Sequence, residues 1–234
     1  MKVLGIIPAR GGSKGIPRKN IKLLGGRPLL AYTVESSLRA RTLTRVILST
    51  EDQEIADLGL ELGVEVPFLR PAGLAQDDTP TFEVVIHSVQ ELESQGETYD
   101  AICLLQPTNP LRRAEDIDAC IELLETLGSD SVVSILSVPE PYNPKWVYWR
   151  SADGSLVLST GDSQPITRRQ DLPDAFHRDG SVYVTRRSVL DEFRNLYGAK
   201  VSGYEIDAQR SVNIDTNEDW VFAERMLNAG SSAA

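Results

Sequence analysis

The stretch that decides the fold is VLGIIPARGGSKGIPRKN, residues Val3 to Asn20, close to the start of the sequence. It begins with an apolar run typical of a buried parallel strand, and a Gly-rich loop with several cations follows at once. These cations are Arg10, Lys14, Arg18 and Lys19. Glycines let backbone N–H groups approach phosphate oxygens, and fixed cations offset the charge of a phosphate chain. The stretch therefore predicts a nucleotide triphosphate site at the carboxyl end of a first strand.

Composition narrows the class of protein. The chain has 234 residues, 41% of them hydrophobic and 25% charged, which is ordinary for a soluble protein of one large or two small domains. A net charge of −10 argues against nucleic-acid binding, which needs a basic face. It also makes the basic loop stand out, since the first acidic residue is Glu35. Cys103 and Cys120 are expected to be reduced core residues rather than a disulfide or a metal site.

No targeting or membrane signal is evident in the sequence. The first residues lack the apolar core of a signal peptide, and no apolar run approaches the roughly 18 residues of a membrane span. We therefore expect a cytoplasmic protein with neither a nucleic acid nor a membrane as its partner.

Predicted strands and helices alternate after the loop. Strands are predicted at 45–49, 64–68, 99–105 and 131–138, and helices at 28–38, 51–62, 81–94 and 114–127. This rhythm is typical of a three-layer α/β/α, Rossmann-like fold with a mostly parallel sheet. Ligands of such sheets bind outside the carboxyl ends of the strands. The loops that carry Arg10, Lys14 and Lys19, Arg70, and Gln106 are thus expected to converge.

The rhythm breaks over residues 139–178. This segment contains five prolines, an Asp153-Gly154 turn and the aromatic run Trp146-Val-Tyr148-Trp149, so it predicts short antiparallel strands and loops. Its aromatic residues could form a packed lobe or a dimer contact, and a dimer contact is favoured. The alternation then resumes with a strand at 181–185, a helix near 188–195, a strand at 200–206 and a helix at 218–227. We expect one domain over residues 1–230 and a frayed tail at 231–234.

The Gly-rich loop does not follow the common phosphate-binding motifs. Lys14 precedes Gly15, which excludes a Walker A motif, and Gly11 and Gly12 are adjacent, which excludes G-x-G-x-x-G. A solvated basic turn would be the alternative. The pattern Ile7-Pro-Ala-Arg10-x-x-Ser13-Lys14-Gly-x-Pro-x-Lys19-Asn20, however, closely resembles the signature of the CMP-sugar-acid synthetases, the acylneuraminate cytidylyltransferases. Relatives that activate the sugar acid Kdo have Lys-Pro where this chain has Lys19-Asn20.

The resemblance covers essentially the whole chain and implies a nucleotidyltransferase fold with defined site residues. Leu69–Ala75, with the residues that follow it, resembles a second nucleotide segment, and Leu104–Arg112 resembles a third. The implied nucleotide-binding residues are Arg10, Gly11, Gly12, Ser13, Lys14, Lys19, Asn20, Arg70, Asp77, Thr79, Thr81 and Gln106. Segments 168–171 and 179–183 resemble the sugar-binding part, which implies sugar contacts for Gln106, Thr108, Lys145, Arg168, Arg169, Gln170 and Tyr183.

Each of these residues also has an ordinary structural interpretation. Arg70 could be a capping or surface arginine, Gln106-Pro-Thr108 a strand-ending turn, and Arg168-Arg169 a solvated pair. Asp215, Glu218 and Asp219 could be an acidic cap at a helix N-terminus. His87 and His177 are expected to be structural or surface residues. Guanidinium groups nevertheless suit a substrate that brings a carboxylate beside a triphosphate.

The reaction that the resemblance implies is attack of the sugar acid's anomeric hydroxyl on the α-phosphorus of CTP, with release of pyrophosphate. Such a transfer depends on positioning and on neutralising charge. Lys19, Arg168, Arg169 and Asp215 are expected to be catalytic, with Mg²⁺ or another divalent cation held by Asp215 and Asn213. The family has Asp-x-Asp where this chain has Asn213-Ile-Asp215, so the first metal position offers an amide oxygen, which can ligate Mg²⁺ but supplies no charge. No general base is evident.

Alternatives remain for the substrate and for activity itself. The acid could be sialic-acid-like, of the legionaminic or pseudaminic type, or another sugar acid. The Asn213 departure also allows a CTP-binding homologue with impaired catalysis. The resemblance further implies a homodimer in which the 139–178 segment reaches across to the partner, where Lys145 could meet substrate.

Overall fold

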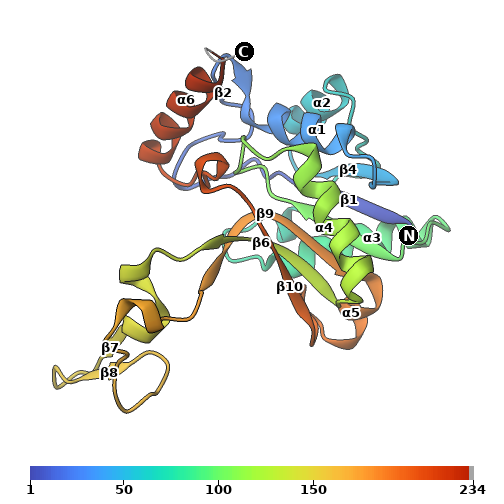
Figure 1. Cartoon of the computed structure of the whole chain (residues 1–234). Helices are drawn as coiled ribbons and strands as arrows, with labels where there is room; N and C mark the ends of the chain where they lie inside the picture. Colours follow the sequence, from blue (N-terminus) through green and yellow to red (C-terminus); the bar gives the residue numbers. More distant parts are fainter. Residues whose placement is uncertain (232–234) are drawn as a thin grey trace.

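Strand β1 (Val3–Pro8) lies inside a six-stranded sheet whose strand order is β10-β6-β9-β5-β1-β4 (Figure 1). The computed structural model describes residues 1–231. The other strands are β4 (Arg45–Ser49), β5 (Ala101–Leu105), β6 (Ser131–Ser137), β9 (Phe176–Arg186) and β10 (Val201–Glu205). Strand β9 runs antiparallel to both of its neighbours, and all other pairs are parallel. The expected mostly parallel sheet is confirmed.

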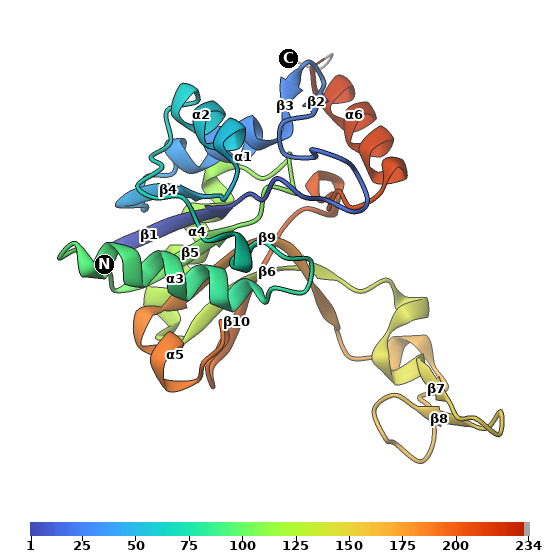
Figure 2. The same cartoon turned by 180° about the vertical axis from the view of Figure 1, so that it is seen from behind.

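Helices cover both faces of the sheet, which gives three layers (Figures 1 and 2). One face carries α1 (Leu29–Arg39), α2 (Gln53–Glu61) and α4 (Ala114–Leu127), and the other carries α3 (Thr81–Ser94) and α5 (Arg187–Glu192). Val3 and Ile7 of β1 belong to the first core, whereas Leu4 and Ile6 belong to the second. Successive side chains of a strand point to opposite faces, so a strand between two helical layers must be apolar throughout. This is the reason for the continuous apolar run at the start of the chain.

A third, smaller core joins the two ends of the chain. The hairpin of β2 (Leu23–Leu24) and β3 (Arg27–Pro28), which the sequence analysis missed, lies beside helix α6 (Asn217–Ser231). Gly25 and Gly26 form its turn with φ of +55° and +82°, a backbone region that favours glycine. Ile16 and Leu24 are fully buried against Ile214 and Trp220. This core places the residues around Asp215 beside the Gly-rich loop.

The strand predicted at 64–68 is not formed. Only Glu65 pairs with the sheet, in a single bridge to Ile47, and Leu48 donates its N–H to the Glu65 carbonyl at 2.8 Å. Pro67 has no N–H to continue a ladder, which limits the pairing to one residue. The chain nevertheless returns to the sheet edge, because the Arg70 N–H donates to the Thr50 carbonyl at 2.8 Å.

Residues 138–175 form an arm that stands away from the sheet (Figures 1 and 2). It contains the short helices η2 (Glu140–Tyr142), η3 (Pro144–Trp146) and η4 (Arg169–Asp171) and an antiparallel ribbon of β7 (Tyr148–Arg150) and β8 (Leu156–Leu158). The predicted short antiparallel strands are therefore present. Strand β9 already begins at Phe176, so residues 176–178 belong to the main sheet rather than to the predicted irregular segment.

Other element boundaries lie close to their predictions. Strand β4 and helices α3 and α4 span the predicted residues, whereas α6 continues to Ser231. Of the tail predicted at 231–234, residues 232–234 lie outside the described residues. Cys103 and Cys120 are both buried and unpaired, as expected, and burial raises the pKa of Cys103 to about 12. Within residues 1–231, no helix is long and apolar enough to cross a membrane.

Candidate active site

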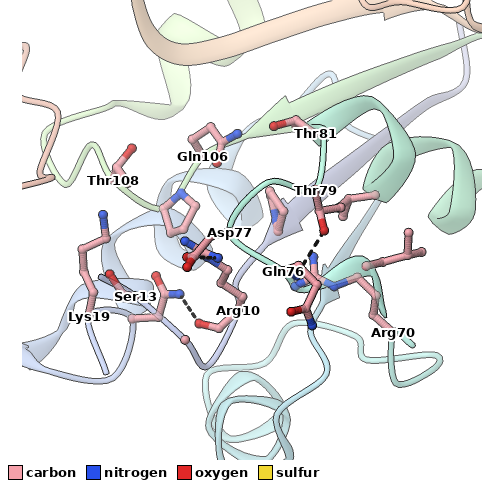
Figure 3. A pocket seen from close by; sticks show the side chains of 16 residues that line it. Arg10, Ser13, Lys19, Arg70, Gln76, Asp77, Thr79, Thr81, Gln106 and Thr108 are labelled. Atoms are coloured by element: carbon pink, nitrogen blue, oxygen red, sulfur yellow. Dashed lines mark hydrogen bonds and ion pairs between the residues drawn. The ribbon is translucent and has the colours of Figure 1, made fainter. Parts of the chain in front are cut away.

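A cavity of about 240 Å³ opens at the carboxyl ends of β1 and β5 (Figure 3). The Gly-rich loop, the loop before α3 with its short helix η1 (Ala72–Leu74), and the turn after β5 line it. Many of the residues expected to bind nucleotide or sugar are brought together here: Arg10, Gly12, Ser13, Lys19, Asn20, Arg70, Asp77, Thr79, Thr81, Gln106 and Thr108. Pro8, Leu74, Gln76, Val84 and Pro107 complete the lining and were not expected. Parallel strands end at the same edge of the sheet, which is why these loops meet.

Asp77 occupies the cationic part of the cavity. Its carboxylate lies 2.7 Å from Nη1 of Arg10 and 3.0 Å from Nζ of Lys14. Hydrogen bonds from Lys14 and then from Arg10 hold the pKa of Asp77 below its ordinary value. Lys14 does not itself line the cavity, and its side chain is 79% exposed. Asp77 thus neutralises two cations of the Gly-rich loop. If the Asp77 carboxylate moved away, Arg10 and Lys14 could bind a phosphate chain instead.

Arg18 has a structural partner outside the cavity. Its guanidinium pairs with Asp52 and Glu54, which belong to the turn after β4 and the first turn of α2. The hydrogen bond from Arg18 lowers the pKa of Asp52, which also accepts the Ile55 N–H at 3.1 Å as the N-cap of α2. Among the loop's four cations, Arg18 therefore anchors the loop to α2.

Lys19 joins the Gly-rich loop to the carboxyl-terminal segment. Its Nζ donates to the Ile214 carbonyl at 2.6 Å and lies 3.1 Å from Oδ1 of Asp215. A Cβ on Gly15 would lie 2.1 Å from the Asp215 carbonyl oxygen, so only glycine permits this approach. Gly11 is similar, with a Cβ position 2.3 Å from Oδ2 of Asp52, whereas Gly12 has open space around it. Two of the loop's glycines thus make room for protein atoms, and Gly12 faces the cavity.

The segment that carries Asp215 is fixed by two long-range contacts. Ile214 donates its N–H to the Thr108 carbonyl at 2.9 Å. The helix η5 (Ala208–Arg210) is held through Arg210, whose guanidinium bonds both carboxylate oxygens of the buried Asp116 on α4 at 2.9 and 3.1 Å. Bidentate pairs of this kind are geometrically demanding. Asp215 is consequently placed beside Lys19, although it does not itself line the cavity.

Arg70 lies at the other end of the cavity from Lys19 (Figure 3). Its residue surface is only 4% exposed, and Nη2 donates to Oε2 of Glu51 at 2.8 Å. Oε1 of Glu51 accepts the Gly11 N–H at 2.7 Å, so this N–H points away from the cavity, which Gly11 does not line. Glu51 was not singled out in the sequence. The signal in the sequence is that Glu51 directly precedes Asp52, the N-cap of α2, and follows the end of a strand.

Asn20 and Gln106 border the cavity from different loops. The Asn20 side chain is buried and donates through Nδ2 to the Arg10 carbonyl at 2.9 Å. Its Oδ1 has no hydrogen-bond partner in the part of the chain that the structure describes. The Gln106 carbonyl accepts from Nη1 of the buried Arg112 at 3.0 Å. Burial lowers the pKa of Arg112 to about 10, so this guanidinium remains charged near neutral pH while it fixes the turn.

The family described as "Cytidylyltransferase" matches residues 4–224.

The chain belongs to the cytidylyltransferase family.

Relatives of this cytidylyltransferase include the CMP-N,N'-diacetyllegionaminic acid synthase of Legionella pneumophila, 30% identical over 100% of this chain and 99% of that protein. The pseudaminic acid cytidylyltransferase of Campylobacter jejuni is 30% identical over all of both chains. The N-acylneuraminate cytidylyltransferase of Escherichia coli is 29% identical over 95% of this chain and 51% of that protein. The expected family is confirmed, and with it the expectation of a nucleotidyltransferase enzyme.

A solved structure supports the fold of the cytidylyltransferase. It is a CMP:2-keto-3-deoxy-manno-octonic acid synthetase complexed with CTP, with a TM-score of 0.75 at 16% identity over 98% of this chain and 100% of that one. At this identity the likeness shows the shared α/β fold.

The arm residues expected to bind sugar do not reach the cavity of their own chain. Lys145 pairs with Asp162 at 2.7 Å, Arg168 with Asp171 at 2.6 Å, and Arg169 with Glu140, all within the arm. Gln170 lies on η4 between them. Tyr183, on β9, packs with Phe68 and Phe82 against the α3-side core and does not line the cavity. The single chain thus brings together the expected nucleotide-binding residues apart from Gly11 and Lys14, but of the expected sugar-binding residues only Gln106 and Thr108.

The expected metal residues form a small polar group. Asn213 donates its Nδ2 to Oδ2 of Asp215 at 2.8 Å, and Asp219 accepts the Asp215 N–H at 3.0 Å. In residues 1–231 there is no cluster of three or more His, Cys, Asp or Glu side chains suited to a metal ion. Asp219 instead caps α6 through Thr216, which agrees with its ordinary structural interpretation. Asp215 and Glu218 are both exposed, and Asp215 is the one that pairs with Lys19, a residue of the cavity lining.

Proposed function

We propose that this cytidylyltransferase transfers the cytidylyl group of CTP to a nonulosonic acid and releases pyrophosphate. The observation that carries the proposal is the cavity at the end of β1. There, Arg10 and Lys19 gather with Gln106, and Lys14 is held at the rim through its ion pair with Asp77. The chain aligns over its whole length with two nonulosonate-activating relatives. Cations on a short Gly-rich loop suit a triphosphate, and a carboxamide suits a ligand that must both donate and accept hydrogen bonds.

The two ends of the cavity carry different groups that could contact CTP. Lys19, Ser13 and Thr108 are at one end, and Arg70, Gln76 and Thr79 are at the other (Figure 3). The buried Asn20 has an amide oxygen without a partner among the described residues. A buried acceptor is costly to leave unpaired, so a donor on the nucleotide would stabilise the complex. This supports a role for Asn20 in binding the nucleotide.

The chemical step would be an in-line displacement. The anomeric hydroxyl oxygen of the acid forms a bond to the α-phosphorus, the bond from that phosphorus to the bridging oxygen breaks, and pyrophosphate carries the electron pair away. The hydroxyl proton is lost, and we assign no residue to accept it. Lys19 and Arg10 would stabilise the charge that grows on the phosphate oxygens, which is the dominant contribution in such transfers.

The residues next to Lys19 offer a divalent cation a single charged ligand. Asp215 offers one exposed carboxylate, whereas Asn213 is turned with its amide nitrogen toward Asp215. Mg²⁺ commonly takes one or two carboxylates and completes its shell with phosphate oxygens and water. We therefore propose that Asp215, with the nucleotide, holds Mg²⁺. The ion would neutralise phosphate charge when it is bound.

A homodimer would complete the sugar site. The arm stands away from the sheet and exposes large apolar side chains, with Tyr142 69% exposed and Trp149 67% exposed. An arm with such a surface suits contact with a second copy of the chain. We propose that Lys145, Arg168, Arg169 and Gln170 of the arm face the cavity of the partner copy. The positive charge of the lysine and the two arginines would suit the carboxylate of a sugar acid, and the neutral Gln170 could donate and accept hydrogen bonds. Tyr183 stays a candidate for the wall between the sites. We propose that the reaction takes place in the cytoplasm.

The experiment that tests this function measures pyrophosphate release. Purified protein with Mg²⁺ is given each of the four nucleoside triphosphates together with N-acetylneuraminic, legionaminic-type, pseudaminic-type or Kdo acid. We expect turnover with CTP and a nonulosonic acid only. The full-length relatives favour the legionaminic or pseudaminic type, and the neuraminate relative favours the sialic type. If the protein binds CTP but releases no pyrophosphate with any of these acids, it is a homologue with impaired catalysis.

A further inference from the structure

Glu51, in the turn after β4, does not line the cavity. It contacts Arg70, which does, and Gly11 of the Gly-rich loop. Its Oε2 accepts from Nη2 of Arg70 at 2.8 Å, and its Oε1 accepts the Gly11 N–H at 2.7 Å. The Glu51 side chain is 17% exposed and the Arg70 side chain 3% exposed. This carboxylate therefore connects the Gly-rich loop to the arginine at the opposite end of the cavity.

The Arg70 guanidinium has more hydrogen-bond donors than the residues around it can accept from. Its Nε is buried and has no partner in the described part of the chain, although the residue lines the cavity. A buried guanidinium needs a counter-charge, and a buried donor needs an acceptor. Glu51 supplies the counter-charge from behind the cavity. The Nε–H has no acceptor among the described residues, so Glu51 is the protein group that fixes the guanidinium.

We propose that Glu51 is a positioning residue for nucleotide binding. It holds the Arg70 guanidinium in one orientation and, through Gly11, holds the Gly-rich loop at a fixed distance from it, before the nucleotide arrives. Pre-organised groups bind more tightly because less ordering remains to be done on binding. This inference rests on the proposed function, since it takes CTP as the ligand. It assigns no contact between Glu51 and the ligand.

The test uses the full-length chain and the variants E51Q and E61Q. The glutamine of E51Q keeps an oxygen for the Gly11 N–H but turns a donor toward Arg70. Glu61, an exposed residue of α2, is the matched control. We expect E51Q to bind CTP about tenfold more weakly by calorimetry, the size of one lost charge-assisted hydrogen bond, while E61Q binds as the unmodified chain does.

A double variant separates positioning from general stability. If Glu51 acts through Arg70, E51Q should change CTP affinity less than about twofold in an R70M background, since coupled residues are not additive. The same factor in both backgrounds would indicate a merely structural role and overturn the proposal, as would equal affinities of E51Q and E61Q. If E51Q does not fold, E51D takes its place, because it keeps the charge but is too short to reach both partners. Unaltered binding by E51D also overturns the proposal. Failure of the unmodified chain to bind CTP would instead refute the proposed function.

Discussion

Arg10 and Asp77 face one another inside the cavity, with 2.7 Å between Nη1 and Oδ1, and Lys14 lies against the second oxygen of the same carboxylate. An anion of the protein thus lies between two of the cations proposed to receive the nucleotide's phosphates. Asp77 belongs to the loop between η1 and α3, so its position links this loop to the Gly-rich loop. A phosphate chain that binds Arg10 and Lys14 has to displace this carboxylate.

The first prediction concerns this displacement. Asp77→Asn removes the competing charge, so tripolyphosphate in the absence of Mg²⁺ should bind several-fold more tightly, because it no longer has to displace a carboxylate from two cations. Titration calorimetry measures the affinity, and Asp78→Asn, a neighbouring exposed carboxylate, is the control. Weaker binding by Asp77→Asn but not by Asp78→Asn would show that Asp77 assists the ligand rather than competes with it.

The second prediction concerns the arm. In a homodimer with exchanged arms, a subunit carrying Lys19→Met has a defective cavity and a sound arm, whereas one carrying Arg168→Ala has the reverse. Co-expression of the two should restore activity to about a quarter of the unmodified level, because half of the dimers are mixed and each has one sound site. Each variant expressed alone is the control. No recovery in isolated mixed dimers would mean that the arm does not serve the partner's cavity.

The third prediction concerns the metal segment. Asn213→Asp places a second carboxylate beside Asp215, and Mg²⁺ prefers charged oxygen ligands. We expect the Mg²⁺ concentration for half-maximal pyrophosphate release to fall several-fold, whereas Asp215→Ala should abolish Mg²⁺-dependent turnover. Asn217→Asp, which adds the same charge on α6, is the matched control. If Asn213→Asp and Asn217→Asp shift the Mg²⁺ requirement equally, position 213 does not face the ion.

The fourth prediction concerns stability and pH. The folded-state pKa of Asp52 is lowered from its ordinary value of 3.8, chiefly by the hydrogen bond from Arg18. A lowered pKa means that the stabilisation is fully present above the ordinary value and is lost as the pH falls through the folded value. Asp52→Ala should therefore lower the free energy of unfolding by about 1–2 kcal/mol near pH 7, counting the N-cap and the ion pair.

Urea denaturation at several pH values measures this effect. The difference between Asp52→Ala and the unmodified chain should stay level from about pH 7 down to about 4, close to the ordinary pKa of an aspartate, and should shrink as the pH falls further toward and below about 3. Asp57→Ala, an exposed change later on α2, should leave the free energy of unfolding nearly unaltered at each pH. A difference that stays constant over this range would show that the Asp52 charge does not contribute.

Much of the fold follows from local patterns in the sequence. The apolar run of β1, the helical spacing in α3 and α4 and the basic loop after β1 each depend on neighbouring residues, and each was predicted within a few positions. Two features could not be found this way. Residues 64–68 carry a strand pattern but pair with the sheet only at Glu65, because Pro67 interrupts the ladder. Strand β9 runs antiparallel because the chain returns from the arm in that direction.

The sequence by itself determined that a cationic, Gly-rich loop follows a strand buried on both faces, because residue types and their spacing suffice for that conclusion. Only the tertiary structure decided which carboxylate stands beside each cation. Lys19 meets Asp215 from 196 positions along the chain, and Arg18 meets Asp52 from 34 positions away. The physical reason is that an ion pair depends on the distance between two side chains in space, and the packing of the cores beneath the loops sets that distance.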